Sequence, residues 1–249
     1  MKKTRILIIE DEESLTETIK LKLSKDGFSI ETASDGKEGL DKVKTVKPDL
    51  LLLDLVLPTL TGEEILKTIK QDKELKKIPV VIISNSGQPV EIRRLLELGA
   101  DDYIIKADFT IDDIEERVVN TLEKREGQPD VLIAEDEAFL RMVLAKKLRM
   151  EGLKVLTTLD GDSSLKTILE TKPKVVVLDL LMPGLSGVEV LQGLKKNSSF
   201  DLKGTKIVVL SNYSGKEDDA IIKEMAVGYF IKSNFDIDEI TDKIKSYVK

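Results

Sequence analysis

The chain of 249 residues contains no cysteine, no histidine and no tryptophan. Without cysteine and histidine it forms no disulfide, offers no thiolate or imidazole ligand to a metal, and has no catalytic triad that uses either side chain. Phosphohistidine chemistry on this chain is excluded for the same reason. Whatever chemistry the protein performs must use carboxylates, hydroxyls and lysines, together with a hard metal ion if a metal takes part.

Long apolar runs and clustered basic residues are also missing. No run approaches the roughly 18 apolar residues of a membrane helix, and the opening MKKTRILIIEDEES turns acidic too early for a signal peptide. The 39 basic and 46 acidic residues give a net charge of −7. This balance argues against a nucleic-acid partner, which needs clustered Lys and Arg. We therefore expect a cytoplasmic protein that binds neither membrane nor nucleic acid directly.

The sequence repeats itself once along almost its whole length. RILIIEDEESL returns as DVLIAEDEAFL, and VKPDLLLLDLVLPTLTG returns as TKPKVVVLDLLMPGLSG. Positions in the second copy are 125 higher up to Gly187, 127 higher at Ser211 and 126 higher at Lys232. A period this long is a whole domain and not a solenoid repeat. The sequence thus predicts a domain over residues 1–125, a short linker at 126–129 and a similar domain over 130–249.

Each copy alternates short apolar runs with longer amphipathic stretches. ILII, LLLL and VVII in the first copy, and VLIA, VVVL and IVVL in the second, lack polar alternation, as is typical of strands covered on both faces. Ile111, Ile114, Val118 and Leu122 recur at helical spacing. Five strand-then-helix units in each copy predict an α/β fold, a doubly wound parallel sheet with helices on both sides.

Polar residues that could take part in a reaction lie where the predicted strands end. In chain order, they are Glu10, Asp11, Asp54, Ser84 and Lys106 in the first copy, and Glu135, Asp136, Asp179, Ser211 and Lys232 in the second. Ligands of such sheets bind beyond the carboxyl ends of the strands. Three carboxylates gathered there repel one another unless a cation lies among them, and Mg²⁺ prefers oxygen ligands. The pattern predicts a magnesium site beside a lysine and a hydroxyl, suited to phosphoryl transfer.

These residues, in this order and duplicated, resemble the receiver domains of bacterial two-component response regulators, the family to which chemotaxis-type receivers belong. The resemblance implies two flavodoxin-like (βα)5 domains with strand order 2-1-3-4-5. It implies that Asp54 and Asp179 accept phosphoryl groups from a histidine kinase or a histidine phosphotransfer protein, and that the chain signals by contact with a downstream protein. Whether the chain forms a homodimer stays open.

The resemblance also implies a role for each remaining residue of the site. Asp11 and Asp136 would bind Mg²⁺ directly, Glu10 and Glu135 through water, and the phosphoacceptors and the carbonyls of Val56 and Leu181 would complete the site. Ser84 and Ser211 match the switch hydroxyl, and Lys106 and Lys232 the phosphate-contacting lysine. Tyr103 and Tyr229 match the aromatic residue whose rotamer reports the switched state, although ordinary packing explains them equally well.

The sequence departs from the family pattern at three places. Ala107 and Ser233 stand where receivers usually carry a proline, often after a cis peptide bond. Asn85 and Asn212 replace the usual small residue after the switch hydroxyl. The turn GADDY of the first copy is shortened to AVGY in the second. We therefore expect two copies that share a site and present different surfaces.

Other functions compete with regulated binding. The sequence as given leads us to expect no output domain, and a phosphorelay intermediate or phosphate sink fits the residues as well. A phosphatase of the haloacid dehalogenase type needs a second Asp where Val56 and Leu181 stand, so turnover as an enzyme is disfavoured. A scaffold that works without phosphorylation stays open because of the departures above. Flavin binding rests on fold analogy alone.

Overall fold

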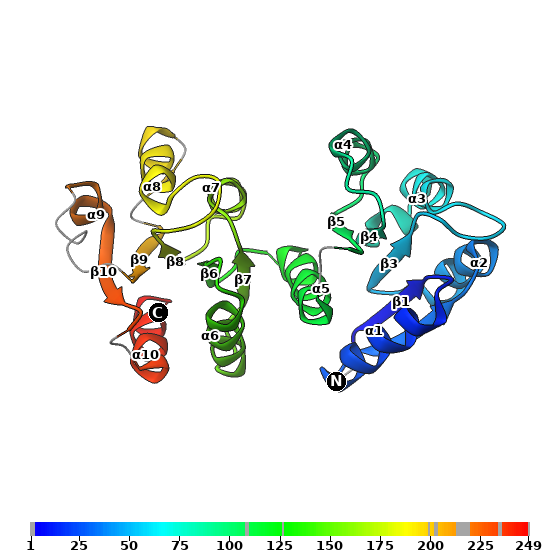
Figure 1. The fold of residues 1–249 in the computed structure, drawn as a ribbon, viewed down its shortest axis with the longest axis horizontal. Coiled ribbons are helices and arrows are strands. Elements are labelled where there is room, and N and C mark those ends of the chain that lie inside the picture. The colour runs from blue at the N-terminus through cyan, green and yellow to red at the C-terminus, as the bar shows by residue number, and fades with distance from the viewer. Residues whose placement is uncertain are drawn as a thin grey trace. The chain divides into compact units, whose positions relative to one another are not determined.

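The computed structural model of the protein describes residues 3–107, 110–125, 127–198, 200–201, 204–212, 220–233 and 236–248. Its contacts divide the chain into two compact units, Met1–Leu122 and Glu123–Lys249 (Figure 1). The linker inferred at residues 126–129 stays a prediction. Among the described residues, none of the helices combines the length and the apolar character needed to cross a membrane.

The first unit is a five-stranded parallel sheet in the order β2-β1-β3-β4-β5. Its strands are β1 (Arg5–Ile9), β2 (Ser29–Ala33), β3 (Leu50–Asp54), β4 (Val80–Ser84) and β5 (Asp102–Ile105). Its helices are α1 (Glu13–Lys25), α2 (Gly36–Val46), α3 (Gly62–Gln71), the short 3-10 helix η1 (Leu75–Lys77), α4 (Pro89–Glu97) and α5 (Ile111–Arg125).

The second unit repeats this topology, with β7-β6-β8-β9-β10 as its strand order. Its strands are β6 (Val131–Ala134), β7 (Val155–Thr158), β8 (Val175–Asp179), β9 (Lys206–Ser211) and β10 (Ala226–Ile231). Its helices are α6 (Ala138–Met150), α7 (Gly161–Thr171), α8 (Gly187–Lys196), α9 (Ala220–Met225) and α10 (Ile237–Val248). The predicted fold class and the strand order 2-1-3-4-5 are confirmed in both copies.

Apolar side chains cover both faces of each sheet. All five residues of β3 and all five of β8 are buried, which explains why their sequences show no polar alternation. Helices α1 and α5 pack on one face of the first sheet, and α2, α3 and α4 on the other. Helices α6 and α10 share one face of the second sheet, opposite α7 and α8 (Figure 1). The predicted buried spacing on α5 is confirmed at Ile114 and Val118.

The two copies differ around their fifth strands. In the first, α4 is followed by a turn at residues 98–101 before β5 begins. In the second, α9 leads directly into β10, whose pairing with β9 shifts register between Ala226 and Gly228. The shortened turn of the second copy is therefore accompanied by a different path of the backbone at this edge.

Glycines allow one helix of each copy to start against the end of the third strand. A Cβ atom at Gly62 would lie 2.0 Å from the carbonyl oxygen of Asp54, and one at Gly187 would lie 2.2 Å from that of Asp179. The sequence marks these glycines only as the start of a helix. The structure adds a second reason, because α3 and α8 press directly on the backbone of the candidate phosphoacceptors.

We predict that Gly187→Ala lowers the free energy of unfolding by about 1–3 kcal/mol, because the new methyl group overpacks against backbone that cannot rotate away. Urea denaturation followed by circular dichroism measures the change. Gly228→Ala is the matched control, since the nearest atom to its Cβ would be 3.5 Å away, and we expect a change within about 0.5 kcal/mol. Equal losses in both variants would contradict the close approach.

Candidate functional site

The register of the strands brings the predicted polar residues to one edge of each sheet. Asp54 is level with Ile83 of β4, so Ser84 lies one residue beyond it. The amide of Lys106 extends the β4–β5 ladder by donating to the carbonyl oxygen of Ser84 at 2.7 Å. Glu10 follows β1 directly and is buried. Residues far apart in the sequence therefore meet at the carboxyl ends of β1, β3, β4 and β5.

One lysine joins two buried carboxylates in the first copy. The Nζ atom of Lys106 lies 2.8 Å from Oε1 of Glu10 and 2.9 Å from Oδ2 of Asp54. Glu10 is 2% exposed and Asp54 is 4% exposed. Because the exclusion of water strengthens charge-assisted hydrogen bonds, this lysine fixes the position of both acids.

The second copy repeats the arrangement. The Nζ atom of Lys232 lies 2.6 Å from Oε1 of Glu135 and 2.8 Å from Oδ2 of Asp179. Both carboxylates are buried here too. The structure thus brings together, in each copy, the lysine and two of the three acids that the sequence singles out.

Burial governs the proton affinities at this edge. It raises the pKa of Glu10, and the neighbouring charge of Asp54 raises it further, against the opposing effect of Lys106. The same causes, burial first, raise the pKa of Glu135. Burial lowers the pKa of Lys106, but its hydrogen bonds to Glu10 and Asp54 outweigh that effect and leave the pKa above its usual value. Each acid cluster therefore favours additional positive charge.

The donor atoms fit a hard divalent cation. Glu10, Asp11 and Asp54 each offer a carboxylate oxygen within 4.8 Å of the others, and Glu135, Asp136 and Asp179 do the same. The Oε2 atoms of Glu10 and Glu135 are buried without a hydrogen-bond partner among the described residues. A buried oxygen in this condition is costly unless an ion or water satisfies it. All ligands are oxygens, and one lysine leaves each cluster with a surplus of negative charge, so Mg²⁺ fits both sites.

Backbone amides hold the other oxygen of each candidate phosphoacceptor. Oδ1 of Asp54 accepts hydrogen bonds from the amides of Leu55 at 2.7 Å and Val56 at 3.4 Å. Oδ1 of Asp179 accepts one from Leu181 at 3.1 Å. The side chains of Val56 and Leu181 are exposed beside the site. That their carbonyl oxygens bind the metal stays a prediction.

The hydroxyl and aromatic residues lie near the acids but differ between the copies. Ser84 and Ser211 are buried at the ends of β4 and β9. The amide of Ser86 donates to Oγ of Ser84 at 3.2 Å, and the hydroxyl of Tyr103 donates to the carbonyl of Ser86 at 2.6 Å. Burial raises the pKa of Tyr103. Tyr229 is only half-buried and packs against the core of the second copy. The switch roles of these four residues stay predictions.

The structure resolves the geometry that the missing prolines leave open. The peptide bonds from Lys106 to Ala107 and from Lys232 to Ser233 are trans. Both lysines reach their carboxylates in this form. Asn85 and Asn212 are exposed after the serines, at the rim of each site.

One residue at the second site is absent from the sequence-based list. Arg141 of α6 is 2% exposed, and its Nη1 atom donates to the carbonyl oxygens of Glu135 at 3.0 Å and Asp136 at 3.1 Å. It shares the buried face of α6 with Leu144 and Leu148, three and seven residues later. A charged residue on an otherwise apolar helix stripe is the signal that could have revealed it.

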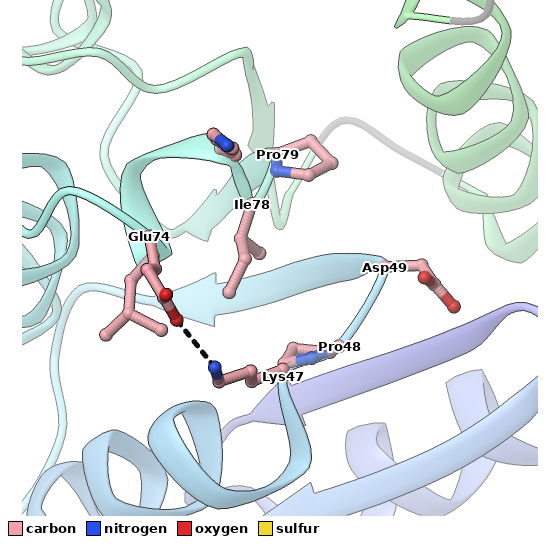
Figure 2. Close-up of a pocket in the computed structure, with 8 residues that line it drawn as sticks. Lys47, Pro48, Asp49, Glu74, Ile78 and Pro79 are labelled. Carbon is pink, nitrogen blue, oxygen red and sulfur yellow. Dashed lines mark hydrogen bonds and ion pairs between the residues drawn. The ribbon is translucent and has the colours of Figure 1, made fainter.

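A cavity of about 250 Å³ in the first copy lies away from these residues. Lys47, Pro48 and Asp49 precede β3 and Pro79 precedes β4, so the cavity opens at the amino ends of the strands, opposite the acid cluster. Figure 2 shows the ion pair between Lys47 and Glu74 at its edge. None of the predicted site residues is among the described residues that line it.

We predict that Glu10→Gln stabilises the metal-free protein at pH 7. Burial raises the folded-state pKa of Glu10 above its usual value of 4.5. The contribution of Glu10 to the free energy of unfolding is therefore fully present below pH 4.5 and is lost as the pH rises through the folded-state pKa. Glutamine does not ionise, so the variant keeps this contribution at pH 7. Urea denaturation in EDTA at pH 7 and pH 4 should show a gain from Glu10→Gln at pH 7 that shrinks at pH 4.

The control for this prediction is Glu17→Gln on α1, because the side chain of Glu17 is 60% exposed. We expect almost no change from it at either pH. A loss of stability from Glu10→Gln of the same size at both pH values would show that burial does not penalise this carboxylate.

Comparisons with known proteins agree with this arrangement. The family model of the response regulator receiver domain matches residues 6–119 and again residues 131–245. The alkaline phosphatase synthesis transcriptional regulatory protein PhoP of Bacillus subtilis is 38% identical over 122 residues, 49% of this chain and 50% of PhoP. The response regulator ArlR of Staphylococcus aureus is 36% identical over 129 residues, 52% of this chain and 57% of ArlR. The chain thus spans about half the length of these curated relatives.

Solved structures are matched over about half of this chain. A CheY-like response regulator receiver domain protein from Methanospirillum hungatei is 26% identical, with a TM-score of 0.47, over 50% of this chain and 98% of that one. The receiver domain of the Francisella response regulator 1452 is 30% identical, with a TM-score of 0.46, over 49% of this chain and 98% of that one. Because the family model covers most of the sequence in two copies, the chain belongs to the response regulator receiver domain family and contains two receiver domains.

Proposed function

We propose that the chain is a cytoplasmic response regulator that accepts a phosphoryl group on Asp54 in the first receiver and on Asp179 in the second. The donor is the phosphohistidine of a histidine kinase or of a phosphotransfer protein, and Mg²⁺ is required. The phosphorylated receivers then act by binding another protein. In this proposal each receiver is a signalling module that promotes its own phosphorylation, and not an enzyme that turns over a substrate.

The observation that supports this proposal most strongly is the lysine-bridged pair of buried carboxylates. Lys106 contacts both Glu10 and Asp54 within 2.9 Å, and Lys232 repeats the contacts in the second copy. A buried ion pair of this kind seldom repays its desolvation cost in stability. Its presence at the ligand-binding edge of both sheets is better explained by a catalytic purpose than by folding.

Each residue of the site has a separate role in the proposed phosphoryl transfer. A carboxylate oxygen of Asp54 attacks the phosphorus of phosphohistidine, and the phosphorus–nitrogen bond breaks as the new phosphorus–oxygen bond forms. Lys106 and the amide of Val56 lie at the carboxylate and are positioned to receive the charge of the phosphoryl oxygens. The hydroxyl of Ser84 adds a further donor. Bound Mg²⁺ would neutralise negative charge on both the acids and the phosphoryl group.

The metal would be held by Asp11, Asp54 and the carbonyl of Val56, with Glu10 acting through water. Asp136, Asp179, Leu181 and Glu135 would act alike in the second receiver. The Oε2 atom of each glutamate is buried and has no hydrogen-bond partner among the residues that the structure describes. This supports the assignment, because the atom could accept a hydrogen bond from a water on the metal.

We predict that incubation of the full chain with Mg²⁺ and acetyl phosphate adds two phosphoryl groups, detected by intact-mass spectrometry. Asp54→Ala and Asp179→Ala should each remove one adduct, and the double variant should remove both. EDTA should prevent both additions, because the acid clusters then repel the incoming anion.

Asp41→Ala is the matched control, since Asp41 is an exposed aspartate of the first receiver outside the site. Two adducts should form on it as on the unmodified chain. Adducts that persist on the double variant, or that form equally well in EDTA, would refute the proposed chemistry.

A further inference from the structure

The two receivers differ in formal charge at the metal site because of one helix position. Arg141 on α6 corresponds to Thr16 on α1, at the same offset of 125 that relates Asp136 to Asp11. The first site contains three carboxylates and Lys106, and the second contains three carboxylates, Lys232 and the Arg141 guanidinium. The first cluster therefore carries about two negative charges and the second about one, since arginine stays protonated.

Arg141 lies against the backbone of the acids themselves. Its Nη1 atom donates to the carbonyls of Glu135 and Asp136 at 3.0 and 3.1 Å, and the residue is 2% exposed. In the first receiver, the hydroxyl of Thr16 makes a single long contact of 3.4 Å with the carbonyl of Glu10. The position thus touches the same backbone in both copies, but only the second copy places a positive charge there.

We infer that Arg141 is a resident cation that weakens Mg²⁺ binding at the second receiver, so that the two receivers of one chain fill with magnesium at different concentrations. This rests on the proposed function, since it assumes that both clusters bind Mg²⁺. A fixed unit charge repels a divalent ion even when partly screened. At a separation of about 8 Å and an effective dielectric constant of about 40–80, Coulomb's law gives a change in affinity of about fivefold to thirtyfold.

The same charge acts in the opposite direction on a phosphoryl group. Phosphorylation adds negative charge to Asp179, which Arg141 helps to neutralise through the low-dielectric interior. The second receiver therefore needs less positive charge from the metal to neutralise its carboxylates and the phosphoryl group, whereas the first receiver needs more. The difference gives the two chemically similar sites different magnesium requirements.

The test measures Mg²⁺ affinity at one receiver of the full chain at a time by isothermal titration calorimetry. Asp11→Ala with Asp54→Ala removes the first site, and Asp136→Ala with Asp179→Ala removes the second. In the first background, Arg141→Met should tighten Mg²⁺ binding by about fivefold to thirtyfold, and Arg141→Lys should leave it near the starting value. In the second background, Thr16→Arg should weaken binding by a similar factor.

Lys146→Met is the charge-matched control, because Lys146 is an exposed residue of the same helix. We expect it to change the dissociation constant by less than about twofold, as a distant screened charge would. Thermal unfolding in EDTA identifies variants that do not fold. If Arg141→Met does not fold, the Mg²⁺ affinity of Thr16→Arg decides the test.

The outcomes separate the inference from the proposed function. If Mg²⁺ binds but neither Arg141→Met nor Thr16→Arg changes the affinity by more than twofold, the inference is wrong and the proposed metal site stands. If Arg141→Lys behaves like Arg141→Met, the arginine acts through its shape and not its charge, which also overturns the inference. If no Mg²⁺ binds in either background, the proposed function fails together with it.

Discussion

The ion pair between one lysine and two buried carboxylates at the carboxyl edge of each sheet is the interaction on which the rest of the site depends. Removing two carboxylates from water is expensive, and a single ammonium compensates only part of the cost. Lys106 and Lys232 hold the acids in place while leaving a surplus of negative charge and a buried glutamate oxygen that has no partner in the described part of the chain. The acid cluster of each copy therefore fits a divalent cation, for which every side-chain ligand would be an oxygen.

The sequence alone predicts much of this arrangement. The offset of 125 between the copies up to Gly187 identifies Asp54 and Asp179 together, and unbroken apolar runs predict strands that are covered on both faces. Parallel strands end at one edge, so residues that follow them must lie close together. Charged or polar residues directly after such strands are thus predictable without coordinates.

The features that could not be predicted from the sequence depend on how the helices and strands pack together. Gly62 and Gly187 read as the start of a helix, and only the coordinates show that a Cβ atom there would collide with the carbonyl of the neighbouring aspartate. Arg141 lies five residues after Asp136 in the sequence, and its contact with the backbone of the site depends on how α6 packs.

The most direct test of the account is the nuclear magnetic resonance spectrum of the full chain with trace Mn²⁺, which occupies Mg²⁺ sites and broadens signals of nearby amides. If Mg²⁺ binds at the acid clusters, the amides of Leu55 and Leu180, next to Asp54 and Asp179, should broaden more than other amides, with Leu55 affected at lower Mn²⁺ than Leu180. Asp11→Asn with Asp136→Asn should abolish the effect. Broadening that is strongest at an exposed acidic residue elsewhere, such as Asp112 on α5, would contradict binding at the acid clusters.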